Sequence, residues 1–145
     1  MDQDGKWLLC RLGNVWYALD LSLVQEIVYQ PALTSLPALG GSVAGMMDWL
    51  GRQITVVDIA GDGGLGRPDL GKPPGLSPVI VLQDGPAAIG LLADEVGEII
   101  PRQAGVKMEI DAQLASAIRS VDGAFEYNDE IIFALNSQEL YQMIA

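Results

Sequence analysis

Short apolar segments, rich in valine, isoleucine and leucine, recur along the chain between glycine-containing or polar turns. Segments of this length and composition are typical of β-strands rather than of long helices. The strands are predicted at 6–12, 15–20, 24–29, 43–48 and 53–59, and again at 78–83, 87–92, 96–101, 121–127 and 130–135. The stretch 61–75 between the two sets is dominated by glycine and proline, and it is predicted to be a loop.

The two sets of strands match each other when the sequence is shifted by 72 residues. Gly13 then falls on Gly85, and residues 24–28 fall on residues 96–100. Further along, Gly45 matches Gly123 at an offset of 78, and Ile54 matches Ile131 at an offset of 77. The extra residues are assigned to 101–118, as an insertion in the second copy. A duplicated unit of five short strands favours a pair of small barrels, which leave few exposed sheet edges.

Two short helices are expected near the end of the chain. Asp111 is placed to cap a helix at 112–119. Asn136, followed three residues later by Glu139, has the spacing of a capping box, and Leu140 begins an apolar stripe behind it. We expect this C-terminal helix to close one end of a barrel, with partner binding as the alternative.

Composition and charge narrow the class of protein. Half of the 145 residues are apolar, so the chain can bury a core as one ordinary domain or as two small subdomains. The formal net charge of −11 argues against a nucleic-acid binder, which neutralises phosphates with clustered basic residues. Neither a signal peptide nor an apolar run of membrane-spanning length is found, so we expect a cytoplasmic protein without direct membrane insertion. The single cysteine, Cys10, lies in an apolar run and is interpreted as a core thiol.

Enzymatic signals are weak. The chain contains no histidine, which removes the commonest general base and the imidazole-based zinc sites. Residues 61–66 match the glycine pattern of dinucleotide-binding loops, but Pro68, Pro73 and Pro74 follow where that motif requires a helix. A carboxylate pair remains as an alternative acid–base system. We expect no catalytic residue, no cofactor and no metal.

Three segments carry the functional signal: 15–27, in which two strands flank a polar turn and the second carries Glu26; 45–59, in which two strands meet near Leu50 and Gly51; and 89–100. In this order and spacing they resemble the chemotaxis coupling protein family, the CheW-like domains. The resemblance extends from about residue 6 to residue 140.

The resemblance implies an all-β fold with short helices. It predicts one domain over residues 1–145, built from two intertwined five-stranded SH3-like barrels around one core, with a C-terminal helix. The boundary between the interleaved subdomains is expected in the 60–78 loop region. It also implies a non-enzymatic adaptor that binds the regulatory domain of a chemotaxis histidine kinase and the cytoplasmic tip of a chemoreceptor.

Family members hold the receptor tip in a groove between the barrels, and the kinase domain is expected at an end of the second barrel through apolar contacts. The matching receptor-groove positions are Val24, Glu26 and Val28 on one wall, and Met46, Asp48, Trp49, Leu50, Gly51 and Arg52 on the other.

The sequence departs from the family pattern at the second hairpin. Where the family has Asn-Leu-Arg-Gly, this chain has Asp48, Trp49, Leu50 and Gly51, so the usual arginine is replaced by Leu50. We expect Arg52, two residues after Leu50, to compensate partly for the lost charge. We expect Trp49 and Leu50 to form an exposed apolar patch there. Two alternatives stay open: a specialised adaptor, for example of a surface-motility pathway, and a CheW-like module of a larger signalling protein.

Overall fold

The computed structural model describes residues 5–29, 43–59, 78–109 and 121–142, and the predicted helix at 112–119, the 61–75 loop and most of the 60–78 boundary lie outside these ranges. Strands dominate the described residues. They are β1 (Lys6–Leu12), β2 (Val15–Asp20), β3 (Val24–Val28), β4 (Val43–Trp49), β5 (Arg52–Val57), β6 (Val79–Asp84), β7 (Ala87–Leu92), β8 (Glu95–Pro101), β9 (Val106–Met108), β10 (Val121–Tyr127) and β11 (Glu130–Leu135). Two 3₁₀ turns, η2 (Leu21–Leu23) and η3 (Arg102–Ala104), and a helix, α2 (Ser137–Gln142), complete the described elements.

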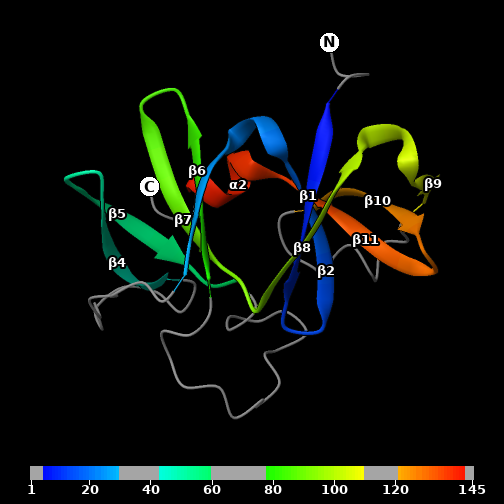
Figure 1. Cartoon of the computed structure of the whole chain (residues 1–145), viewed down its shortest axis with the longest axis horizontal. Helices are drawn as coiled ribbons and strands as arrows, with labels where there is room; N and C mark the ends of the chain where they lie inside the picture. Colours follow the sequence, from blue (N-terminus) through cyan, green and yellow to red (C-terminus); the bar gives the residue numbers. More distant parts are fainter. Residues whose placement is uncertain (1–4, 30–42, 60–77, 110–120, 143–145) are drawn as a thin grey trace.

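The strands form two sheets that lie side by side (Figure 1). The first sheet has the order β8-β1-β2-β11-β10-β9, and the second has the order β3-β6-β7-β5-β4. Each sheet contains one parallel pair, β2 with β11 and β5 with β7, among otherwise antiparallel neighbours. The mostly β fold with a short C-terminal helix is therefore confirmed.

The two sheets are built alike, but each takes strands from both halves of the chain. Strands β1 and β2 of the first sheet correspond to β6 and β7 of the second, and β8, β10 and β11 correspond to β3, β4 and β5. The bulges correspond as well, because the β1–β8 and β3–β6 ladders each shift register at the equivalent point. The sequence repeat is thus a structural repeat in which the halves exchange strands.

The structure corrects one offset in the repeat. Trp49 pairs with Arg52 in the β4–β5 hairpin, and Tyr127 pairs with Glu130 in the β10–β11 hairpin, so both turns contain two residues. The offset therefore stays at 78 across the hairpin, and Ile54 corresponds to the buried Ile132 rather than to the exposed Ile131. Two adjacent isoleucines made the sequence match ambiguous.

The first sheet is larger than expected. Its sixth strand, β9, pairs with β10, although the sequence predicts no strand there. The side chains of β9 are all exposed, so the period-two burial pattern that identifies a strand is missing. The backbone ladder to β10, and not the burial of a face, defines this strand.

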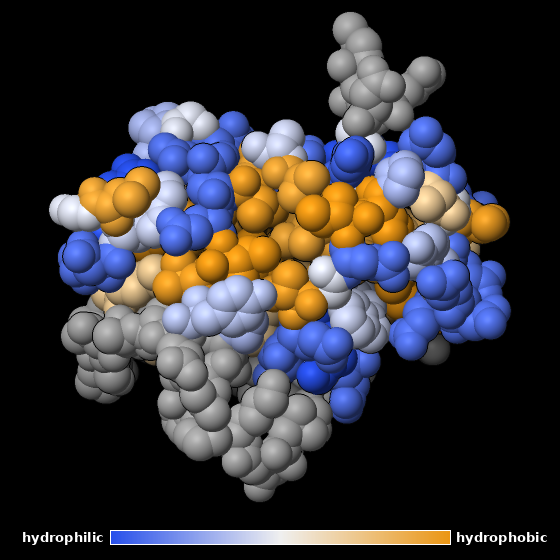
Figure 2. Space-filling view, viewed as in Figure 1, coloured by the Kyte–Doolittle hydropathy of each residue, from blue (hydrophilic) through white to orange (hydrophobic). Residues whose placement is uncertain are grey.

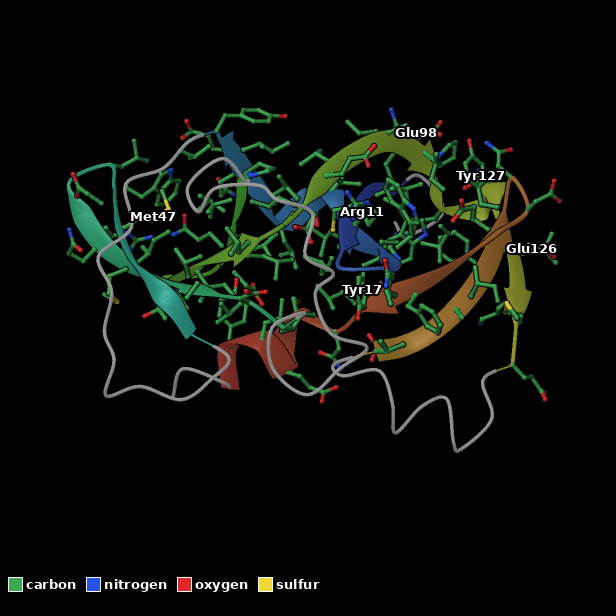
Figure 3. All side chains as sticks on the ribbon, turned by 90° about the horizontal axis from the view of Figure 1, so that it is seen from below. Arg11, Tyr17, Met47, Glu98, Glu126 and Tyr127 are labelled. Carbon is green, nitrogen blue, oxygen red and sulfur yellow. The ribbon has the colours of Figure 1, made fainter. Side chains whose placement is uncertain are left out.

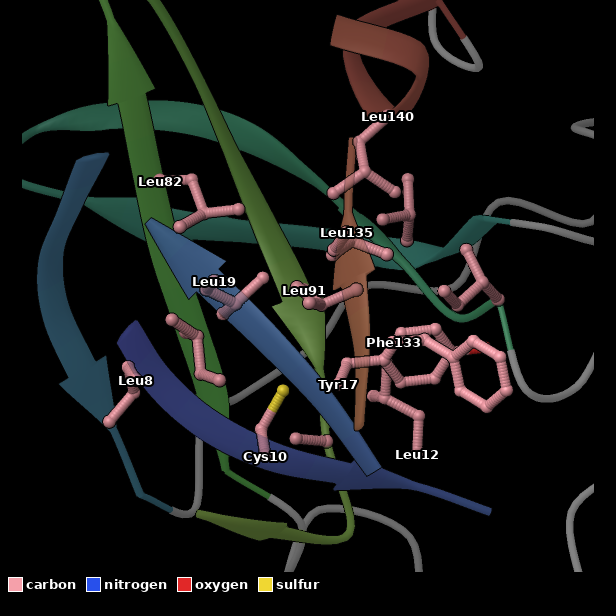
Figure 4. Close-up of a cluster of buried hydrophobic side chains, with 14 of the residues drawn as sticks. Leu8, Cys10, Leu12, Tyr17, Leu19, Leu82, Leu91, Phe133, Leu135 and Leu140 are labelled. Carbon is pink, nitrogen blue, oxygen red and sulfur yellow. The ribbon is translucent and has the colours of Figure 1, made fainter. Parts of the chain in front are cut away.

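A central cluster of buried side chains joins the two sheets (Figure 4). It contains Leu8, Cys10 and Tyr17 from the first sheet together with Leu82 and Leu91 from the second. Burial raises the pKa of the Cys10 thiol to about 12, as expected for a core thiol rather than a nucleophile. Two smaller buried clusters each consist of side chains from one sheet alone.

Helix α2 covers the central cluster instead of one barrel end. Its Leu140 is fully buried in that cluster. The predicted cap is confirmed, since Asn136 Oδ1 accepts hydrogen bonds from the backbone N–H of Gln138 (2.9 Å) and Glu139 (3.3 Å). Gln138 Nε2 also donates to Asp84 of the second sheet (3.0 Å), while Asn136 Nδ2 donates to Asp122 of the first (2.8 Å). The start of the helix is therefore tied to both sheets.

The chain crosses from the second sheet back to the first at Asp94. This buried carboxylate accepts a hydrogen bond from the backbone N–H of Gly13 at 2.7 Å, and the Asp94 N–H donates to the Arg11 carbonyl at 2.9 Å. The crossing segment is thereby fixed against the β1–β2 turn, where Gly13 has a φ of 65°.

Candidate partner-binding site

Trp49 links the two edge strands of the second sheet. Its indole Nε1 on β4 donates a hydrogen bond to Glu26 Oε1 on β3 at 3.0 Å, although β3 and β4 are at opposite edges of the sheet order. The sheet must therefore curl so that its edges approach each other. The Arg52 guanidinium lies over the same indole, with Cζ 5.5 Å from the ring centroid, and donates to the Pro86 carbonyl at 3.3 Å.

The expectation that Trp49 is exposed is wrong. The side chain is 7% exposed and packs with Met47, Ile54 and Val56 inside the second sheet. The inward orientation follows from strand alternation, because Met47 and Trp49 point to one face of β4 and Met46 and Asp48 to the other. Leu50, by contrast, is 79% exposed at the tip of the turn, as expected.

A bulge in β3 divides the residues predicted to form one wall of the groove. The register with β6 shifts between Val24 and Glu26. As a result Val24 packs against the central cluster, whereas Val28 packs against the buried cluster of the second sheet and the exposed Glu26 accepts the Trp49 hydrogen bond at its rim. An unbroken strand would have placed all three on one face, which is what the sequence prediction assumed.

The remaining predicted positions lie around the β4–β5 hairpin. Met46 is half-buried, and its sulfur accepts a hydrogen bond from the Thr55 hydroxyl at 3.3 Å. Asp48 is exposed, and Gly51 has a φ of 84° in the turn. The structure thus brings Glu26, Trp49 and Arg52 into contact. Strand β4 belongs to the same sheet as β3, so it does not form the opposite wall of a groove between the sheets.

The strand that faces β3 across the centre of the molecule is β8. Figure 2 shows apolar surface gathered over this centre, where η2, β3 and β8 lie in Figure 1. Partly buried side chains of these elements pack against the central cluster from outside. Ile99 of β8 is 52% exposed and pairs with Leu8, a member of that cluster, so its side chain is on the same side of the sheet. We call this surface the central apolar face; it consists of Leu21, Leu23, Val24, Ile27, Val96 and Ile99.

Sequence reasoning identified only Val24 of this face. The turn at residues 20–22 was interpreted as polar, yet it forms η2, in which Asp20 caps the backbone N–H of Ser22 (3.0 Å) while Leu21 and Leu23 remain half-buried. The repeat did contain the signal. At the offset of 72, Val24 falls on Val96 and Ile27 falls on Ile99, so the same apolar positions recur in both halves.

The first sheet carries a counterpart of the Glu26–Trp49 contact. Tyr127, the equivalent of Trp49, donates its hydroxyl to Glu98 Oε2 at 3.1 Å, and Glu98 is the equivalent of Glu26. Burial, and then the adjacent Glu98 carboxylate, raise the pKa of Tyr127. Figure 3 shows Glu98 and Tyr127 close together at one end of the molecule, far from Met47 of the second sheet.

The described ranges contain neither a candidate metal site nor a candidate membrane-spanning helix. Within residues 5–29, 43–59, 78–109 and 121–142, no group of three histidine, cysteine, aspartate or glutamate side chains is arranged to hold a metal ion. A helix with the length and apolarity needed to cross a membrane is likewise not found in these ranges. Each of the two sheets contains strands from both halves of the chain, and the sheets share one core. With an apolar face between the sheets, this arrangement defines a small β-domain of the protein-interaction class.

The chain belongs to the CheW-like domain family, whose model matches residues 6–145. Its fold is similar to the crystal structure of the scaffolding protein TtCheW from Thermoanaerobacter tengcongensis, with a TM-score of 0.74 and 24% sequence identity over 92% of this chain and 84% of that one. No match is found among curated protein sequences. CheW-like domains are non-enzymatic scaffolds that couple chemoreceptors to the kinase CheA, so the chain is a chemotaxis-type adaptor and not an enzyme.

Proposed function

We propose that this chain couples the cytoplasmic tip of a chemoreceptor to the regulatory domain of a chemotaxis histidine kinase, and that it does so in the cytoplasm. The proposal combines the family membership with the central apolar face. Each partner is assigned below to a surface of this chain.

The central apolar face is the observation that carries the receptor assignment. It lies between the two sheets and is formed by equivalent elements of both halves of the chain. A surface of this kind suits the apolar stripe of an amphipathic helix, which binds through residues spaced three and four apart. Glu26 and Arg52 then mark the polar end of the second sheet, where a charged partner residue changes specificity more than affinity.

The kinase regulatory domain is assigned to an end of the second sheet, at the β4–β5 hairpin. Leu50 projects into solvent there, next to the Trp49 ring that Arg52 covers. An exposed leucine at a hairpin tip is stabilised when an apolar surface of a partner covers it. Its replacement of the family arginine favours a partner pair with altered specificity, such as that of a surface-motility pathway.

Ile99→Glu tests the receptor assignment. Ile99 is half exposed, so the substitution should leave the fold intact while placing a charge in the apolar contact. We expect binding of a receptor-tip fragment, measured by titration calorimetry, to weaken at least about tenfold, and binding of the kinase regulatory domain to be unchanged.

Val106→Glu is the matched control, because Val106 is 70% exposed on β9, away from the central apolar face. It should bind both partners as the unmodified chain does. Equal binding of the receptor fragment by Ile99→Glu and the unmodified chain would contradict the receptor assignment. A loss of kinase binding instead would transfer that partner to the central apolar face.

A further inference from the structure

A pocket of about 220 Å³ opens beside the Glu98–Tyr127 contact of the first sheet. Its lining consists of Leu9, Trp16, Glu98, Tyr127, Asn128, Glu130 and Ile132. Leu9 and Ile132 are buried and form an apolar floor, and Trp16 is a half-buried wall. The two carboxylates are exposed at the rim. At this volume the pocket is smaller than typical small-molecule sites of roughly 300–1,000 Å³, and it suits a single side chain.

The backbone of β8 fixes the position of the Trp16 ring, which forms one wall of the pocket. A Cβ atom at Gly97 would approach Trp16 Cζ3 to 2.8 Å, so the indole packs directly over the glycine. Glu98 follows Gly97 in the strand and also accepts the Tyr127 hydroxyl. The aromatic wall and one rim carboxylate are therefore held in place by the same short segment.

The repeat within the chain provides an internal comparison. In the second sheet, Glu26 and Trp49 are the equivalents of Glu98 and Tyr127. The Arg52 guanidinium lies over the Trp49 ring. In the first sheet the residue equivalent to Arg52 is Glu130, since both pair across their hairpins with the aromatic residue. The second sheet thus contains an arginine beside its glutamate and its aromatic ring. The first sheet has a second glutamate, Glu130, at the equivalent position, next to the pocket.

We propose that this pocket receives an arginine side chain presented by a protein partner. The apolar floor accommodates the methylene stem, and the planar guanidinium stacks on Trp16 and donates to Glu98 and Glu130. Lysine fits less well, because its ammonium is a compact, strongly hydrated charge that makes no forked contact. The net charge of −11 favours the approach of such a basic segment.

The test is a titration of the full chain with N-acetyl-arginine amide, followed by the NMR signal of the Trp16 indole N–H, which Trp16→Phe assigns. We expect a saturable shift that weakens with salt. The matched citrulline derivative, which keeps the shape and loses the charge, should bind at least about tenfold more weakly.

Substitutions in the chain distinguish a specific arginine site from non-specific electrostatic attraction to an acidic surface. Glu130→Gln should weaken binding of the arginine amide severalfold, whereas Glu126→Gln, an equal charge change at an exposed position outside the pocket lining, should not. Glu130→Arg, which copies the arrangement around Arg52, should abolish binding and leave the thermal unfolding curve cooperative.

Three results would overturn the proposal. They are equal binding of the citrulline and arginine amides, equal weakening by Glu126→Gln and Glu130→Gln, and tighter binding of spermine than of the arginine amide. The last would assign the pocket to a small free cation. None of these results bears on the central apolar face, so the proposed function is tested independently.

Discussion

Trp49 is held between groups of opposite charge. Glu26 accepts its indole N–H at 3.0 Å, and the Arg52 guanidinium lies over its ring. Because the ring also packs with Met47, Ile54 and Val56, the polar contacts orient a side chain that belongs to the core of the second sheet. Glu26 is therefore both a rim residue and a structural partner.

Trp49→Ala should lower the free energy of unfolding by about 3–5 kcal/mol, because it removes a large buried aromatic group and leaves a cavity. Trp49→Phe keeps much of the volume and loses the hydrogen bond to Glu26, so it should cost less. Urea denaturation followed by circular dichroism measures both. If Trp49→Ala is as stable as the unmodified chain, the side chain is not part of the core.

The β4–β5 hairpin combines strain with exposure. Leu50 has a φ of 52°, a left-handed conformation that costs a leucine roughly 1–2 kcal/mol, and Gly51 follows with a φ of 84°. The equivalent turn between β10 and β11 places Asn128 and Asp129 in the same conformation, with residues that tolerate it. Leu50 is therefore poorly suited to its turn and poorly suited to solvent, which is consistent with selection for a contact.

Leu50→Asn should raise the free energy of unfolding by about 1 kcal/mol, since Asn-Gly is the preferred pair for such a turn. Asn128→Leu is the reciprocal change and should lower the free energy of unfolding by a similar amount. Thermal denaturation of both variants measures the difference. An unchanged or lowered stability of Leu50→Asn would show that the backbone strain is relieved elsewhere.

The C-terminal cap and all the strands except β9 follow from local sequence, because alternation and the Asn136–Glu139 spacing are local signals. The orientation of Val24 and Glu26 does not, because the bulge between them depends on pairing with β6. The burial of Trp49 was missed for a related reason. A tryptophan next to a hairpin tip looks exposed until the two edges of the sheet are known to meet.

At the scale of the whole molecule, four strand ladders join the first half of the chain to the second. They are β1 with β8, β2 with β11, β3 with β6, and β5 with β7. The remaining described ladders pair strands of the same half. Neither half can complete a sheet without the other.

Residues 1–68 and 69–145, prepared as separate chains, should each fail to unfold cooperatively. Mixed in equal amounts, they should recover a single thermal transition and the dispersed NMR spectrum of the intact chain, because each sheet needs strands from both. Cooperative unfolding of either fragment alone would contradict this prediction and would identify an independent domain. The result also tests the boundary proposed in the 60–78 region.

The four ladders that join the two halves of the chain also allow two molecules to associate at high protein concentration. Two chains that unfold together can exchange their halves and re-form every ladder, because each β1 meets an identical β8 whichever chain supplies it. Such a domain-swapped dimer keeps the central apolar face and the first-sheet pocket intact and carries two copies of each. On the receptor assignment proposed above, such a dimer would bind clustered receptors with higher avidity than the monomer, without any new contact within the protein.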